Sequence, residues 1–205
     1  WLKPDGTLYS AGETITLPSL ANTLKKMVEA ERASAHLGRR AAIAAARNRF
    51  YTGDIADEMV SFLQAHGAPF QKSDFADFYA RIEDPVHTEY RGYTIYKQGF
   101  VSQGPVLLQT LNILEHFNLK EMGHNTTDYL HTIVEAMKLA YADRDTYYAD
   151  PEYVRVPATG PLSKSYARER ASIIDDRRAS TAFVAGNPLP HDPDVKEWPY
   201  WVANI

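Results

Sequence analysis

Asp143 and Arg144 are the adjacent residues whose types and position best fit a chemical role. A guanidinium binds a carboxylate through two parallel hydrogen bonds, so Arg144 can hold a substrate carboxylate or one of this chain. Both residues lie toward the C-terminal end of a predicted helix, where a positive charge is favoured. We expect a structural ion pair of Asp143 and Arg144. In this structural role Arg144 locks its helix to a neighbour through Asp143, Asp145 or Asp150.

Other chemistry finds little support. The seven histidines include no H-E-x-x-H or comparable ligand pair, and the run at Asp143–Asp145 lacks the glycine of a calcium loop. No phosphate-binding glycine pattern occurs, so we expect no metal and no cofactor. Ser102 lies in V-S-Q-G-P rather than in a nucleophile turn of the G-x-S-x-G type. A serine–histidine–aspartate triad assembled from distant positions stays open.

The composition excludes some partners. The 205 residues are 44% hydrophobic and 23% charged, with a formal charge of −4 and no cysteine. The negative charge argues against nucleic acid and anionic membranes as partners. No apolar run is long enough to span a bilayer. The absence of cysteine leaves the compartment open, and a cytoplasmic location is favoured over a periplasmic one. Both ends of the chain have the character of cut sites, so we expect the chain to be part of a longer protein.

The elements that must position Asp143 and Arg144 are mostly helices. Helices are predicted from Pro18, over the alanine-rich stretch 38–49, between Gly53 and Gly67, and from a Ser73 cap through Tyr79. Alternating β-branched and aromatic residues predict two strands, 86–90 and 93–97, around Arg91-Gly92.

Three further helices are predicted behind the strands. One begins at Pro105, one runs from a cap at Asn125 or Thr126 to about Tyr148, and one runs from Ser163 to Ile174. The inward stripe expected on the long helix is Leu130, Ile133, Val134, Met137 and Tyr141. We therefore divide the chain into a helix-rich segment, 1–174, and an extended, partly mobile tail, 175–205.

Short segments in a particular order resemble the gamma-glutamyltransferase (gamma-glutamyltranspeptidase) family of N-terminal-nucleophile hydrolases. They are found at 16–24, 50–56, 73–75, 90–93, 101–105, 108–115, 135–145, 149–151, 154–157 and 162–167. Two features place the chain among divergent branches of that family. Gly99–Pro105 stands where better-known transpeptidases have a proline-rich segment ending in Ser-Ser-Gly-Gly, and Glu31–Arg49 is a longer insertion.

The resemblance implies an α+β fold, as the helix-rich part of an αββα sandwich completed by a second, small subunit. It implies a precursor that cuts itself, with a threonine at the new N-terminus as nucleophile. That threonine is expected beyond Ile205, so no catalytic residue is assigned to this chain. The expected partners are the small catalytic subunit and a small amide substrate, in a heterodimer or a dimer of heterodimers.

Three functions are therefore weighed. The first is a large-subunit segment of an enzyme that hydrolyses or transfers a gamma-glutamyl or related acyl group from an amide such as glutathione. The second is an acylase of the same superfamily that acts on another small amide. The third is a non-catalytic binding or scaffold module that kept the fold and lost the nucleophile.

Overall fold

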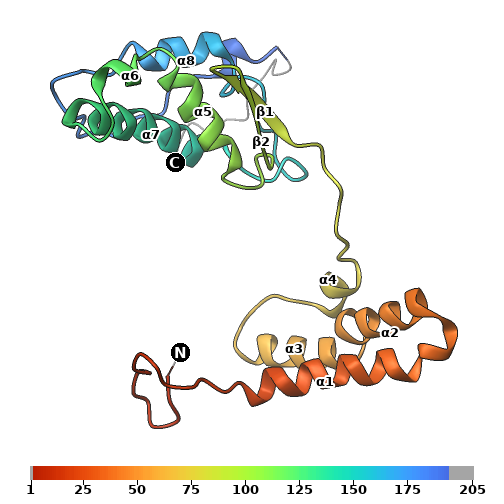
Figure 1. Ribbon diagram of the computed structural model, residues 1–205. Coiled ribbons are helices and arrows are strands. Elements are labelled where there is room, and N and C mark those ends of the chain that lie inside the picture. The colour runs from red at the N-terminus through yellow and green to blue at the C-terminus, as the bar shows by residue number, and fades with distance from the viewer. Residues whose placement is uncertain (1, 194–205) are drawn as a thin grey trace. The chain divides into compact units, whose positions relative to one another are not determined.

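A computed structural model describes residues 2–193 of the chain. The expected tail beyond residue 193, including Ile205, lies outside the described residues. The chain divides between Arg81 and Ile82 into two units, each with its own internal packing (Figure 1). Each unit is described by itself.

The first unit is helical. It contains α1 (Pro18–Ala33), the 3₁₀ turn η1 (Ala35–Leu37), α2 (Arg39–Tyr51), α3 (Asp54–Ala65) and α4 (Lys72–Ala76). Pro18 occupies the first turn of α1, where its missing N–H costs no hydrogen bond. Helix α2 packs against both α1 and α3. The buried apolar residues of this unit are Ala42, Ile55, Ala56 and Val60.

Arg49 joins the three longer helices of the first unit. Its guanidinium donates to Asp54 at 2.9 and 3.2 Å, to Glu29 at 3.2 Å and to the carbonyl oxygen of Lys26 at 2.6 Å. Gly53 permits the tight turn between α2 and α3, because a Cβ there would lie 2.7 Å from the carbonyl oxygen of Arg49. The hydrogen bond from Arg49 is the main cause that lowers the pKa of Asp54 to about 2.

Helix α4 differs from its prediction at both ends. Its N-cap is Gln71 rather than Ser73, and it ends at Ala76 rather than Tyr79. The Asp74 carboxylate accepts a hydrogen bond from the Gln71 amide at 2.8 Å and closes a capping box. Helix α4 therefore starts earlier than predicted, because this capping box satisfies the first amide groups of the helix.

The second unit begins with a hairpin of β1 (Val86–Tyr90) and β2 (Tyr93–Lys97), which confirms both predicted strands. The strands are antiparallel, with Thr88 opposite Ile95. The turn residues Arg91 and Gly92 have φ angles of 50° and 87°, as a two-residue hairpin turn requires.

Four helices follow: α5 (Gly104–Leu114), α6 (Leu119–Met122), α7 (Thr127–Tyr147) and α8 (Lys164–Ala171), with a 3₁₀ turn η2 (Leu189–His191). The predicted caps are confirmed at Thr126 and Ser163, whose hydroxyls accept from the amides of Tyr129 and Tyr166.

Helix α5 is the centre of the second unit and packs against β1, α7 and α8 (Figure 1). The core cluster consists of Ile113, Leu114, Ala136, Ala167 and Ala171. The buried amide of Asn112 ties three elements together. It accepts from Thr88 at 2.5 Å and from Lys164 at 2.7 Å, and it donates to the carbonyl oxygen of Leu162 at 2.9 Å.

The inward stripe expected on α7 is wrong for Leu130, Val134 and Met137, whereas Ile133 packs against the core cluster. The buried residues of this helix are Thr132, Glu135, Ala136, Ala140, Ala142 and Asp143. Leu130, Val134 and Met137 are 47%, 49% and 40% exposed. Alanines bring the buried face close to its neighbours, and buried polar groups are accepted there because they are hydrogen-bonded. The exposed apolar residues Leu130, Val134 and Met137 are left outside this face.

Candidate functional site

The Asp143 carboxylate is fully buried and is surrounded by hydrogen-bond donors. Its Oδ1 lies 3.2 Å from Nη2 of Arg170 and accepts from the Gly186 amide at 2.7 Å. Its Oδ2 accepts from the Tyr166 hydroxyl at 2.9 Å and from the Gln109 side-chain amide. A buried charge is tolerated only with such partners, so this network explains how α7 holds a carboxylate in the core.

The network also perturbs the ionisation of its members. Burial raises the pKa of Asp143 above its ordinary value, against the opposing effects of Arg170, Gly186, Tyr166 and Gln109. Burial, followed by the nearby Asp143 charge, raises the pKa of the Tyr166 hydroxyl. Tyr166 therefore stays protonated and serves as a hydrogen-bond donor.

Arg144 points elsewhere and does not pair with Asp143. Its guanidinium donates to Asp145, to Gln103 Oε1 at 2.8 Å, and lies over the Tyr141 ring at 4.8 Å from the centroid. The expected ion pair is thus replaced by two separate pairs, Asp143–Arg170 and Arg144–Asp145. The reason is geometric, since neighbouring residues on a helix point about 100° apart.

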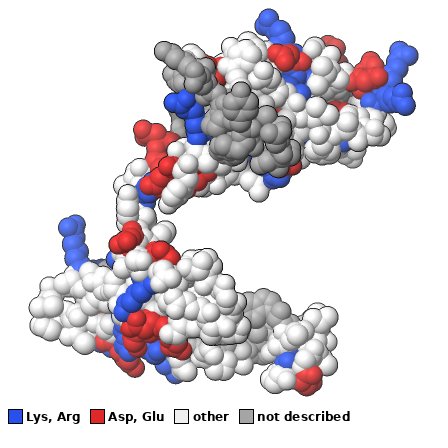
Figure 2. All heavy atoms as spheres, turned by 180° about the vertical axis from the view of Figure 1, so that it is seen from behind, with Lys and Arg blue, Asp and Glu red and all other residues white. Residues whose placement is uncertain are grey.

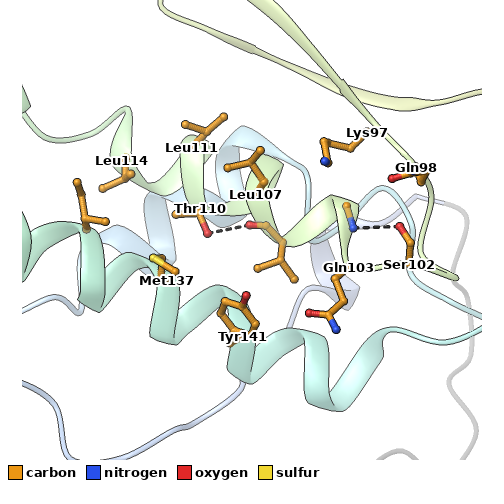
Figure 3. A pocket seen from close by; sticks show the side chains of 13 residues that line it. Lys97, Gln98, Ser102, Gln103, Leu107, Thr110, Leu111, Leu114, Met137 and Tyr141 are labelled. Atoms are coloured by element: carbon orange, nitrogen blue, oxygen red, sulfur yellow. Dashed lines mark hydrogen bonds between the residues drawn. The ribbon is translucent and has the colours of Figure 1, made fainter. Parts of the chain in front are cut away.

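A groove of about 500 Å³ lies between α5 and α7, below the end of β2 (Figure 3). Its walls are mostly apolar, and Leu107 of α5 faces Met137 and Tyr141 of α7 across it. Polar residues gather at one end, where Lys97, Gln98, Ser102 and Gln103 lie. Its mostly apolar and partly exposed lining fits contact with an apolar partner.

Ser102 is engaged within its own loop. Its hydroxyl donates to the carbonyl oxygen of Gly99 at 3.0 Å. The same hydroxyl accepts from the Gly104 amide at 3.0 Å (Figure 3). These bonds stabilise the turn into α5. Gly104 permits the approach, because a Cβ there would lie 2.5 Å from the carbonyl oxygen of Gln98.

A serine, a histidine and a carboxylate do meet at α8 and η2, which sequence reasoning missed. Ser165 Oγ lies 2.8 Å from His191 Nδ1, and His191 Nε2 lies 3.1 Å from Glu169 Oε2. Glu169 is 57% exposed and the imidazole packs beside the Tyr166 ring. A triad also needs donors aimed at a developing oxyanion. The observed contacts instead hold η2 against α8. In the sequence, the only indication of this contact was the spacing of Ser165 and Glu169 on one helix.

Residues 2–193 contain no group of three or more histidine, aspartate or glutamate side chains arranged to hold a metal ion. Within the same range, none of the helices has the length and apolar character needed to cross a membrane. Positive and negative side chains lie interspersed over the described surface seen in Figure 2.

Comparison with known proteins identifies the relatives of this chain. A family model described as gamma-glutamyltranspeptidase matches residues 1–198. The chain is 32% identical to a glutathione hydrolase proenzyme of Escherichia coli over 191 residues, covering 92% of this chain and 30% of that protein. It is 34% identical to an acylase ACY 1 proenzyme of a Pseudomonas species, covering 66% of this chain and 25% of that protein.

A solved structure of Helicobacter pylori gamma-glutamyltranspeptidase superposes with a TM-score of 0.71 at 27% identity, covering 88% of this chain and 48% of that one. The fold is therefore a helix-rich α+β part of an N-terminal-nucleophile hydrolase. The chain belongs to the gamma-glutamyltranspeptidase family. It spans less than a third of the length of the two curated relatives named above.

Proposed function

We propose that this chain is a large-subunit segment of a gamma-glutamyltransferase-like enzyme. The enzyme hydrolyses or transfers a gamma-glutamyl or related acyl group from a small amide such as glutathione. The observation that carries this proposal is the family match over residues 1–198. The word proenzyme in the names of both relatives supports a precursor that is processed.

The proposed chemistry needs a nucleophile from outside this chain. A threonine at the N-terminus of a small catalytic subunit attacks the substrate carbonyl through its hydroxyl, and its own amine accepts the proton. Backbone donors stabilise the oxyanion, the amide nitrogen leaves protonated, and water or an acceptor amine resolves the acyl-enzyme. The residues of this chain act as scaffold, with the pair of Asp143 and Arg170 fixing α7 to α8.

The groove between α5 and α7 supports the proposed second subunit. Leu107 and Met137 line this groove and remain 45% and 40% exposed. Apolar side chains gathered in this way mark a surface that another part of a protein covers. We place the small subunit of the same precursor on this face, in a heterodimer or a dimer of heterodimers.

A second candidate is an acylase that acts on a different small amide, and the acylase relative at 34% identity favours it. Steady-state rates with gamma-glutamyl-p-nitroanilide and with acylated β-lactam amides distinguish the two substrates. A higher kcat/KM for the gamma-glutamyl compound supports the first, and the reverse order supports the second.

The test of the enzyme itself uses the full precursor. Intact mass and N-terminal sequencing are expected to find a second chain that begins with threonine. An acyl-enzyme trap is expected to label that threonine. An intact precursor that has no threonine, serine or cysteine nucleophile within a few tens of residues after Ile205 and takes up no label would contradict the enzyme and favour a scaffold module.

A further inference from the structure

Lys97 carries the charge in the lining of the groove between α5 and α7. It is the last residue of β2, and its side chain extends toward the start of α5 at the polar end of the groove (Figure 3). The other described residues that line the groove are uncharged. Lys97 is half-buried, so its ammonium group gives up part of its contact with water beside apolar walls. An anion at this position would restore what the ammonium group loses.

No acid of the described chain supplies that anion. Within residues 2–193, the Lys97 ammonium group makes no hydrogen bond and no ion pair. By contrast, Lys138 and Lys164 of the same unit are each held by a glutamate, at 2.6 and 2.7 Å. Lys120 also makes no such contact in this range, but it is exposed on α6, where water solvates it. Lys97 therefore combines partial burial with an unmatched charge.

Gln103 adds a neutral donor at the same end of the groove. Its Oε1 accepts from Arg144 at 2.8 Å, so the oxygen of this side-chain amide faces the guanidinium. Its nitrogen carries two N–H donors. That nitrogen makes no hydrogen bond within residues 2–193. The charge of Arg144 is already matched by Asp145. The polar end thus offers a cation and an amide donor, and a carboxylate can accept from both.

The apolar part of the groove has a defined length. Leu107, Leu111 and Leu114 follow one another along α5 and line one wall. The rise from Leu107 to Leu114 on an α-helix is about 10 Å. An extended chain covers that distance with about three residues. Met137 and Tyr141 of α7 form the facing wall. The groove therefore fits a short apolar segment with an acid at one end.

We propose that the small subunit fills this groove with a short extended segment, apolar over about three residues and flanked by an aspartate or glutamate that pairs with Lys97. This inference rests on the proposed function, which places the small subunit on the same face. The carboxylate accepts from the Lys97 ammonium group and from the Gln103 amide. Matching charges of this kind fix the register of a docked segment. Lys97 selects and positions the partner and does not react with the substrate.

The first experiment identifies the partner of Lys97 in the processed enzyme without any substitution. A carbodiimide couples an amine to a carboxylate that it contacts, and mass spectrometry of the digested enzyme then identifies both peptides. We expect a cross-link from Lys97 to an aspartate or glutamate of the small chain. The same product is expected to be missing from the Lys97→Met enzyme.

The second experiment measures the association of separately expressed large and small chains. Lys97→Met keeps a long side chain without its charge, and it is expected to bind the small chain about fivefold more weakly or worse, because the carboxylate loses its cation. Lys97→Arg keeps the charge and is expected to bind within about twofold of the wild type. Lys120→Met is the matched control at an exposed site outside the groove lining, with binding also expected within about twofold.

The possible results separate this inference from the proposed function. A wild-type precursor that yields no small chain, or wild-type chains that do not associate, overturn the proposed function. Chains that associate, with Lys97→Met binding as tightly as the wild type or more tightly, overturn this inference alone, since a purely apolar segment would favour methionine. A processed enzyme in which Lys97 forms no cross-link to the small chain also overturns it. If Lys97→Met does not fold, the cross-link in the wild-type enzyme decides by itself.

Discussion

The Oδ1 atom of Asp143 lies 2.7 Å from the amide nitrogen of Gly186, 43 residues later in the chain. The same oxygen lies 3.2 Å from Arg170, so one buried carboxylate joins α7, α8 and the segment that carries Gly186. Each of these partners loses its hydrogen bond if the carboxylate is removed. The contact therefore links the stability of the second unit to the path of its C-terminal segment.

Asp143→Asn is expected to destabilise the protein by about 3 kcal/mol, because Arg170 is left as a buried charge without its ion-pair partner. Asp145→Asn is the matched control two residues further along the same helix. Asp145 is 59% exposed, so its loss is expected to cost less than about 1 kcal/mol. Urea unfolding of the second unit within the full precursor measures both. Equal losses would contradict the assigned roles.

Gly160→Ala is expected to destabilise the second unit by about 1–3 kcal/mol through overpacking. A Cβ at residue 160 would lie 2.4 Å from the carbonyl oxygen of Pro188, which is backbone and cannot rotate away. Thermal unfolding beside the control Gly99→Ala, where an added Cβ would have no atom within 4 Å, measures the difference. An unchanged melting temperature would show that the 159–160 and 188–192 segments do not pack as described.

Asp54 is expected to titrate near pH 2 in the folded protein, below the 3.8 of an unperturbed aspartate. A lowered folded pKa means that the stabilisation is present above pH 3.8 and is lost as the pH falls through 2. Carboxyl NMR titration measures this pKa directly. Arg49→Met is expected to return the midpoint toward 3.8, and a midpoint unchanged by that substitution would rule out the Arg49 contact as its cause.

Met137→Lys is expected to weaken association of the proposed small subunit at least tenfold, because a charge enters the apolar groove. The residue is 40% exposed, so the second unit itself is expected to keep its melting temperature. Ile173→Lys, at a site 59% exposed and outside the groove lining, is the control. Co-purification of separately expressed chains measures association, and equal recovery of both variants would contradict the assigned surface.

Local structure was largely predictable. The hairpin strands 86–90 and 93–97 matched, as did the caps at Thr126 and Ser163. These features depend on residues within a few positions of one another, such as the Thr126 hydroxyl and the Tyr129 amide. The cap of α4 was missed because it depends on a capping box in which the Asp74 carboxylate accepts from the Gln71 amide.

The sequence by itself also determined the family, since the ordered segments and the family match point the same way. Only the tertiary structure decided which partner each charge takes. Asp143 meets Tyr166 and Gly186, 23 and 43 residues away, while Arg144 turns toward Gln103. Helix periodicity favours the larger apolar stripe of α7 as its buried face. Packing instead buries Ala136 and Ala140, because small side chains allow α7 to approach its neighbours closely and Asp143 finds its donors on that side.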